Sequence, residues 1–256
     1  ALRDESARRG IVFFSSPFDE ASADMLAALG VALFKIPSGE ITNLGYLRHI
    51  AAKRRPIILS TGMSTLEEIA AAVDAIRRAG DPPLALLQCV SAYPAPAEET
   101  NLRAMDTLRD RFACPVGLSD HTTGIEVAIA AVARGAAIIE KHFTVDKTLP
   151  GPDHRASLDP AEFAALVRSV RRVEAALGDG DKRPMPSETD TRRVARKSLV
   201  AARPIARGEK ISREMIAVKR PGTGISPADL ERAIGRTAAR ALAADEVIEW
   251  AALEGA

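Results

Sequence analysis

The feature that most constrains the fold is a unit that recurs six times before residue 178. Each unit begins with a short apolar run, continues into small or charged polar residues, and ends in a segment whose apolar residues have helical spacing. Because the runs are almost continuously apolar, we expect parallel strands that are buried on both faces. The expected strands lie at 11–15, 32–36, 56–62, 84–89, 116–122 and 138–142.

The segments between these runs carry signals of helix ends. Gly30 is typical of the stop after a helix at 19–29. Ser64 to Glu67 has the spacing of a capping box, which predicts a helix that runs from there to Arg78. Further helices are expected at 43–53, 101–111, 124–134 and 160–177.

Polar clusters follow every expected strand, and this favours a (β/α)8 TIM barrel, because active sites of such barrels assemble at the carboxyl ends of the strands. A doubly wound sheet is the structural alternative, but no glycine-rich phosphate-binding turn follows the first strand. Six units are too few to close a barrel of eight. We therefore expect a partial barrel at 1–177, two further units upstream, and an aggregation-prone chain when it is expressed alone, because strands 11–15 and 138–142 would be unpaired edges.

Two histidines occupy equivalent places in consecutive units. His121 and His142 each follow an expected strand directly, and the carboxyl ends of neighbouring parallel strands meet at one rim. Neutral imidazoles are ligands for Mn, Fe, Zn or Cu, so the pair predicts a metal site. The alternative is that each histidine only forms a hydrogen bond within its own loop.

Composition argues against several partners. The net charge is +1 with 27% charged residues, which gives no reason to expect nucleic acid or a membrane surface as partner. No signal peptide is visible and no apolar run approaches the roughly 20 residues of a transmembrane helix, so we expect a cytoplasmic protein. Cys89 and Cys114 lack metal or redox spacing and are expected to be buried thiols.

The composition changes after residue 177. Residues 178–190 are rich in Gly, Pro and charged residues, which is typical of a linker. Beyond them, apolar stretches at 196–202, 211–219 and 236–250 are separated by turn residues. We therefore expect a second, smaller domain at 191–256.

Several motifs in order identify the chain as similar to a known family. It resembles the bacterial sialic acid synthases over all 256 residues, from their third barrel strand to their C-terminus. The segment from about Arg192 onward resembles the antifreeze-like (SAF) domain that follows the barrel in these enzymes. The motifs that carry the resemblance are 15–18, 34–40, 59–63, 93–96, 117–122, 140–144, 151–153 and 218–224.

The resemblance implies a site and an assembly. It places a divalent metal, usually Mn²⁺ with Mg²⁺ or Co²⁺ as alternatives, on His121 and His142. It implies a domain-swapped homodimer, in which Arg220 of one subunit enters the barrel of the other. The remaining matched positions are Ser16, Lys35, Ser38 and Ser119 for phosphoenolpyruvate, Ser91 for a further substrate hydrogen bond, and Glu40, Tyr93 and Asp153 around the metal and the amino sugar.

The reaction that the resemblance implies joins C3 of phosphoenolpyruvate to the aldehyde of an N-acetylated amino sugar, which the metal polarises; water then adds at C2 and phosphate leaves. Glu40 is the candidate for handling the proton of that water. Each role has an alternative. Lys35 could form a Schiff base, Tyr93 could only pack, Glu40 could bond to a neighbouring turn, and Arg220 could be a surface residue.

Two classes of function therefore stay open. The first is a nonulosonic acid synthase that makes N-acetylneuraminate from N-acetylmannosamine, with N,N'-diacetyllegionaminate or pseudaminate as alternative products. The second is a catalytically incomplete fragment, because the first two strands of the family, one with another phosphate-binding lysine, have no counterpart in the 256 residues.

Overall fold

The computed structural model describes residues 1–255. The chain divides into two compact units between Asp179 and Gly180, inside the segment expected to be a linker. Each unit has its own hydrophobic core, and each is described separately. No described helix is both long enough and apolar enough to cross a membrane.

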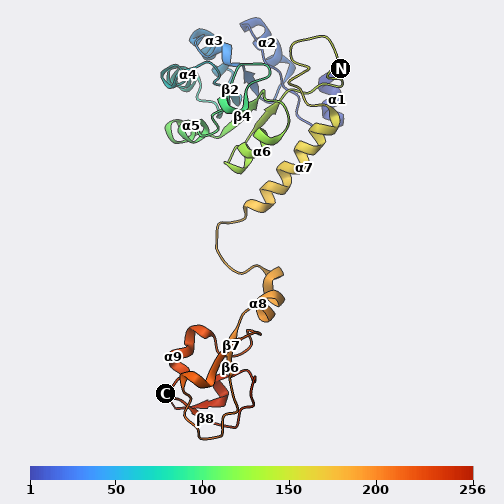
Figure 1. Ribbon diagram of the computed structural model, residues 1–256. Coiled ribbons are helices and arrows are strands. Elements are labelled where there is room, and N and C mark those ends of the chain that lie inside the picture. The colour runs from blue at the N-terminus through green and yellow to red at the C-terminus, as the bar shows by residue number, and fades with distance from the viewer. Residues whose placement is uncertain (256) are drawn as a thin grey trace. The chain divides into compact units, whose positions relative to one another are not determined.

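The first unit is built on a parallel sheet whose strands follow one another in chain order (Figure 1). A doubly wound sheet reverses its strand order at a switch point, whereas the order seen here is that of a barrel wall. The strands are β1 (Phe34–Ile36), β2 (Ile57–Ser60), β3 (Leu84–Cys89), β4 (Val116–Asp120) and β5 (Ile139–Lys141). The helices are α1 (Leu2–Arg8), α2 (Glu20–Leu29), α3 (Leu44–Ala51), α4 (Leu66–Ala79), α5 (Ala104–Phe112), α6 (Glu126–Ala133) and α7 (Pro160–Leu177), with short 3₁₀ turns η1 (Ser38–Glu40) and η2 (Ala97–Glu99).

The first expected strand differs from the prediction. Residues 11–15 contribute only one bridge, from Ser15 to Phe34, so the described sheet has five strands. The bridge is parallel and lies beside β1, which is the place expected for the strand. Ile11 and Val12 are 62% and 65% exposed, so little burial holds this edge in an extended conformation.

The helix ends follow from local side chains. Asp19 accepts a hydrogen bond from the Ser22 backbone at the start of α2, and Gly30 ends that helix in the left-handed region at φ 84°. The predicted capping box at Ser64 and Glu67 is wrong by one residue, because Thr65 and Glu68 exchange the two bonds. The helix prediction for 160–177 is confirmed by α7.

Alternation along the strands separates a helix-facing side from a polar side. The buried residues Phe34, Ile36, Leu59, Leu86 and Leu118 pack with the helices in the main core. Their neighbours in the chain point to the opposite face of the sheet. These neighbours include Lys35, Ser60 and Ser119, and Cys89, three positions after Leu86, is on the same face, so the period of two places polar groups together on the inner side of the wall.

The second unit pairs short antiparallel strands around its own core. The strands are β6 (Ser198–Ala201) with β7 (Ile216–Lys219), and β8 (Thr237–Ala238) with β9 (Leu253–Glu254). The core is made by buried residues such as Leu199, Ile211 and Ile248. The remaining elements are α8 (Thr189–Ala195), α9 (Leu230–Ala233) and the 3₁₀ turns η3 (Pro186–Glu188), η4 (Arg213–Met215), η5 (Pro227–Asp229) and η6 (Trp250–Ala252).

Candidate active site

A pocket of about 520 Å³ lies at the carboxyl ends of the strands of the first unit. Side chains from all five strands or from the loops that follow them line it. Most of the residues predicted from the sequence are in the lining: Ser16, Lys35, Ser38, Ser91, Tyr93, Ser119, His121 and His142. The fold therefore brings together polar groups that are up to 126 residues apart, from Ser16 to His142 (142 − 16).

Lys35 is the buried cation of this pocket, with 6% exposure. Its Nζ donates to Ser60 Oγ at 2.9 Å and to the Ile36 carbonyl at 3.0 Å, and it lies 3.6 Å from Glu140 Oε2. Burial lowers the pKa of Lys35, and the negative charge of Glu140 opposes that effect. The ammonium is thus held in a fixed position by three acceptors.

Further hydroxyl groups line the same pocket as Lys35. Ser38 Oγ accepts a hydrogen bond from the Gly62 backbone at 2.9 Å, and Ser119 Oγ donates to Glu140 Oε1 at 2.8 Å. A Cβ on Gly62 would lie 2.5 Å from Ser91 Oγ and 2.9 Å from Ser38 Oγ. Only glycine allows the chain after β2 to pass this close to the two serines.

Elsewhere in the pocket lining, three rings form a cluster. The centroids of His121 and His142 are 5.1 Å apart, and Tyr93 lies 4.2 Å from His121 and 5.6 Å from His142. Burial, the charge on Cys89 and the carboxylates of Asp153 and Glu140 raise the pKa of Tyr93, so its hydroxyl is protonated at neutral pH. The predicted convergence of the two histidines at one rim is therefore what the fold produces.

The hydrogen bonds of His121 determine which ring nitrogen is available. Its Nδ1 lies 2.8 Å from the Val90 carbonyl, which can only accept, so in the neutral ring Nδ1 carries the proton and Nε2 keeps its lone pair. Burial lowers the pKa of His121, but hydrogen bonds with Cys89 and Val90 and the charge on Cys89 outweigh it, and the net shift is upward. For Cys89, burial raises the thiol pKa, but bonding to His121 brings the net pKa below its ordinary value.

The two imidazoles fit a metal ion as a partial set of ligands. Burial lowers the pKa of His142, with the neighbouring His121 acting in the same direction, so the ring is neutral at physiological pH. Neutral imidazole is the form that binds metals. In residues 1–255 no group of three or more His, Cys, Asp or Glu residues is arranged to hold a metal, so the donor set is that of an open site that water or substrate oxygens would complete.

Three predicted residues lie outside the pocket lining. Asp153 is near it, with Oδ2 3.7 Å from His142 Nδ1. Glu40 belongs to η1 and accepts a hydrogen bond from Asn43 Nδ2 at 3.0 Å, which is the bond to a neighbouring turn considered as its alternative role. Arg220 belongs to the second unit, where its Nε donates to the Ala195 carbonyl at 3.1 Å.

Sequence reasoning missed three lining residues with polar or ionisable side chains: Ser60, Cys89 and Glu140. Glu140 matters most, because it contacts both Ser119 and Lys35. The signal was its position in β5, where it follows the half-buried Ile139 and precedes Lys141. Period-two alternation places Glu140 on the same face as His142.

Comparison with known proteins identifies the family. The model of the NeuB family matches residues 1–182, and the model of the SAF domain matches residues 196–254. The chain belongs to the NeuB family. The resemblance drawn from the motifs and the expectation of a C-terminal SAF domain are thereby confirmed.

Several relatives of this NeuB family chain are sugar acid synthases. The N,N'-diacetyllegionaminic acid synthase of Legionella pneumophila is 47% identical over 249 residues, which cover 96% of this chain and 70% of that protein. The human N-acetylneuraminate-9-phosphate synthase is 39% identical over 241 residues, covering 93% of this chain and 67% of that protein. The chain thus spans about seven tenths of the length of these relatives.

A solved structure of the same kind confirms the fold. The N-acetylneuraminic acid synthetase of Leptospira borgpetersenii, in complex with citrate, superposes with a TM-score of 0.70 at 41% identity, covering 74% of this chain and 66% of that one. The five parallel strands with their outer helices therefore correspond to part of a TIM-barrel wall in the NeuB family.

Proposed function

We propose that this chain carries the condensing site of a nonulosonic acid synthase, which joins phosphoenolpyruvate to an N-acetylated amino sugar and releases phosphate. The observation that carries the proposal is the pocket itself. It combines one buried ammonium and several hydroxyls with two histidines whose rings pack edge to face. An anionic substrate and a metal-assisted carbonyl each find their kind of ligand there.

Phosphoenolpyruvate is assigned to the part of the pocket around Lys35. The phosphate and the carboxylate need a cation and hydrogen-bond donors, and Lys35 with Ser16, Ser38 and Ser119 supplies them. Lys35 Nζ is already oriented by Ser60 and the Ile36 carbonyl, so little side-chain entropy is lost when the anion binds. These residues hold the enol so that its C3 is available for bond formation.

The amino sugar is assigned to the part around the rings. His121 Nε2 and the His142 ring would hold a divalent metal, Mn²⁺ in the first instance with Mg²⁺ or Co²⁺ as alternatives, and when bound it would act as a Lewis acid on the sugar aldehyde. Tyr93 packs against both histidines and limits the freedom of their rings. Asp153, beside His142, and Ser91 provide hydrogen-bond partners for the sugar.

We assign the proton of the attacking water to Glu140 in preference to Glu40. Glu140 lies in the pocket lining between Ser119 and Lys35, whereas Glu40 is bonded to Asn43 outside it. Glu140→Gln is expected to lower kcat by about 100- to 10,000-fold, the range of general acid–base catalysis. Glu40→Gln is expected to stay within about 2-fold, as surface changes do. Steady-state phosphate release by both variants checks this, and the reverse ranking would return the role to Glu40.

The sugar is the finer question. N-acetylmannosamine is the substrate that the motifs imply, but the legionaminic acid synthase is 47% identical to this chain, against 39% for the human neuraminate-9-phosphate synthase. We therefore propose the diacetylated amino sugar that yields N,N'-diacetyllegionaminate as the first candidate. The test measures phosphate release by the native enzyme with phosphoenolpyruvate and each sugar in turn. A higher kcat/KM with N-acetylmannosamine, or with the pseudaminate precursor, would overturn this choice.

We further propose a homodimer in which Arg220 serves the pocket of the partner subunit. Arg220→Ala and His121→Ala subunits, each inactive alone, are then expected to regain part of the native activity when mixed, because random exchange creates one pocket with both residues intact. Mixing His121→Ala with the matched surface variant Arg207→Ala, which retains activity, gives the upper reference, because every pocket with an intact His121 is then functional. No gain above the unmixed Arg220→Ala protein, with subunit exchange verified by mass labelling, would rule out service across subunits.

A further inference from the structure

A buried ion pair joins the two strands that carry the histidines. Asp120 Oδ2 lies 2.8 Å from Lys141 Nζ, and the two side chains are 0% and 1% exposed. Neither residue contributes a charge to the pocket chemistry described above. Two buried charges are costly to desolvate, and a well-packed apolar pair is often as stable. Stability alone therefore does not explain why an ion pair is found beside the site.

The pair lies at the last paired position of β4 and β5. Asp120 is the register partner of Lys141, and the pair before it is Ser119 with Glu140. His121 directly follows the end of β4, and His142 directly follows the end of β5. The ion pair is thus the last cross-strand connection before the chain presents its two imidazoles.

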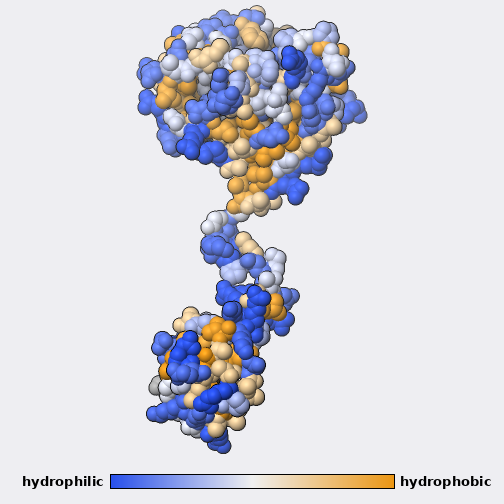
Figure 2. All heavy atoms as spheres, in the orientation of Figure 1, coloured by the Kyte–Doolittle hydropathy of each residue, from blue (hydrophilic) through white to orange (hydrophobic). Residues whose placement is uncertain are grey.

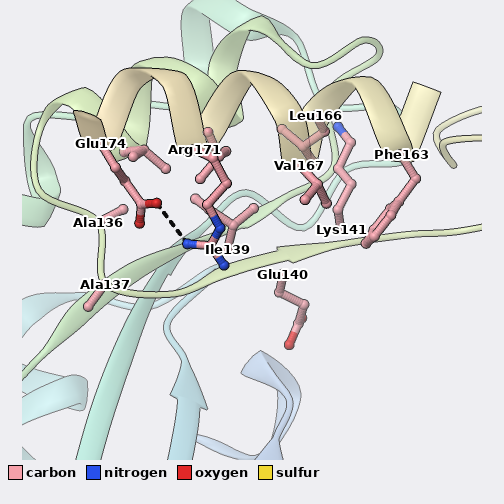
Figure 3. Close-up of a pocket in the computed structure, with 12 residues that line it drawn as sticks. Ala136, Ala137, Ile139, Glu140, Lys141, Phe163, Leu166, Val167, Arg171 and Glu174 are labelled. Atoms are coloured by element: carbon pink, nitrogen blue, oxygen red, sulfur yellow. Dashed lines mark hydrogen bonds and ion pairs between the residues drawn. The ribbon is translucent and has the colours of Figure 1, made fainter. Parts of the chain in front are cut away.

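The pair faces away from the pocket. Figure 3 shows Lys141 leaving β5 toward α7, whereas Glu140 points to the opposite side of the strand. Lys141 borders a separate cavity of about 450 Å³ between β5 and α7, together with Phe163, Leu166 and Val167. It cannot touch a substrate in the catalytic pocket from that side, so any effect it has must pass through the backbone.

The remaining polar atoms of the pair hold the turn after β4. Lys141 Nζ donates to the Thr122 carbonyl at 2.5 Å. Asp120 Oδ1 accepts from the Thr122 backbone N at 2.9 Å and from Thr122 Oγ1 at 2.8 Å. His121 is therefore bracketed by two residues that are both tied to Lys141, the residue that precedes His142.

We propose that Asp120 and Lys141 are positioning residues that fix the separation of His121 and His142 and thereby set metal affinity and turnover. The inference rests on the proposed metal site and deepens it. The physical reason is that two ligands on different strands keep a fixed geometry only if the strands cannot slide or splay at their ends. The rings themselves have few bonds that would do this: His121 has Val90 and Cys89, and His142 has Asp153.

The test compares three variants with the native enzyme: Asp120→Asn, Lys141→Met and the double variant Asp120→Asn/Lys141→Met. The single variants leave one buried charge without its partner, which destabilises the fold. The double variant removes both charges and keeps the Asn acceptor for Thr122, so its thermal transition is expected to lie near that of the native enzyme. We expect the double variant still to bind Mn²⁺ about 10- to 100-fold more weakly by calorimetry, with kcat reduced by a similar factor, as for other groups that orient ligands.

Asp106→Asn is the matched control. Asp106 on α5 pairs with Arg134 after α6, so it also links elements that flank β4 and β5, but it lies outside the catalytic pocket. Its Mn²⁺ affinity and kcat are expected to stay within about 2-fold of native. A double variant with native affinity and native kcat would overturn the proposal and leave the pair a purely structural feature. A native enzyme that does not bind Mn²⁺ would instead refute the metal site on which the inference rests.

Discussion

Replacing either His121 or His142 with alanine is expected to lower kcat by about 1,000-fold or more, because a metal that polarises a carbonyl contributes several kcal/mol to transition-state stabilisation. The site offers only these two imidazoles, whose centroids are 5.1 Å apart, so neither can be lost without leaving a single protein ligand. The measurement is phosphate release at saturating Mn²⁺, together with Mn²⁺ binding by calorimetry.

His49→Ala is the matched control for this prediction. His49 lies on α3, bonds to Asp24 at 2.8 Å and is outside the catalytic pocket. Its loss is expected to leave kcat and Mn²⁺ affinity within about 2-fold of native, as for a surface ion pair. Native turnover in His121→Ala or in His142→Ala would show that the ring replaced in that variant is not needed for the chemistry. A loss of turnover with unchanged Mn²⁺ binding would assign the rings a role other than metal binding.

The parts of the fold that could be predicted from the sequence depend on local signals and on burial. The runs that form β2 and β3 are mainly apolar, and such runs are typical of strands buried between two layers. Helix starts at Asp19 and Asp159 were marked by side chains that bond the first turn. The capping box was placed one residue early because Ser64 and Thr65 are both good N-cap residues. The choice between them depends on the residue at which the helical backbone begins, which is Leu66.

A strand was predicted at 11–15, but the single bridge that forms there could not be predicted, because pairing depends on the neighbours of a segment and not only on its own residues. Ile11 to Phe14 have high strand propensity, yet in the described chain only Ser15 pairs, and only with Phe34. Strand propensity expresses how a residue fits a half-buried pleated surface. Because Ile11 and Val12 are exposed, they lack the packing partners through which that preference stabilises a strand.

The site residues divide in the same way. His121, His142 and Lys35 could be predicted because they stand at or near strand ends, where the geometry of parallel strands determines which rim they reach. Only its alternation with His142 could have ranked Glu140 above Lys141, since β5 is three residues long and both residues are polar. The structure separates them, because Glu140 faces Ser119 in the pocket and Lys141 faces Asp120 behind it. Asp153 reaches His142 through a loop, whose path no periodicity describes.

Lys35→Met is expected to lower kcat/KM for phosphoenolpyruvate by about 30- to 4,000-fold, the equivalent of the roughly 2–5 kcal/mol that truncating one partner of a buried charge pair costs. Most of the loss should appear in KM for phosphoenolpyruvate, because the ammonium binds the anion in the ground state as well as in the transition state. Methionine keeps the length and the apolar stem of lysine. The packing beside Ser60 and Glu140 is therefore disturbed little, and the change tests the charge.

Lys53→Met is the matched control, because Lys53 is also largely shielded, with 15% side-chain exposure, but pairs with Asp24 outside the catalytic pocket. Its KM for phosphoenolpyruvate is expected to stay within about 2-fold of native. A Lys35→Met enzyme with an intact thermal transition and native KM for phosphoenolpyruvate would contradict the assignment of the anion to this residue.

A second experiment distinguishes anion binding by Lys35 from its alternative role, the formation of a Schiff base. A nucleophilic amine needs a free lone pair. Here Nζ donates to Ser60 Oγ and to the Ile36 carbonyl, and Glu140 lies 3.6 Å away. This is the environment of a protonated ammonium group with three acceptors. Burial lowers the pKa of Lys35, but the carboxylate of Glu140 favours the charged form that these acceptors need. Incubation with substrates and borohydride is therefore expected to leave activity intact. Inactivation accompanied by a substrate-derived adduct on Lys35 would establish covalent catalysis in place of anion binding.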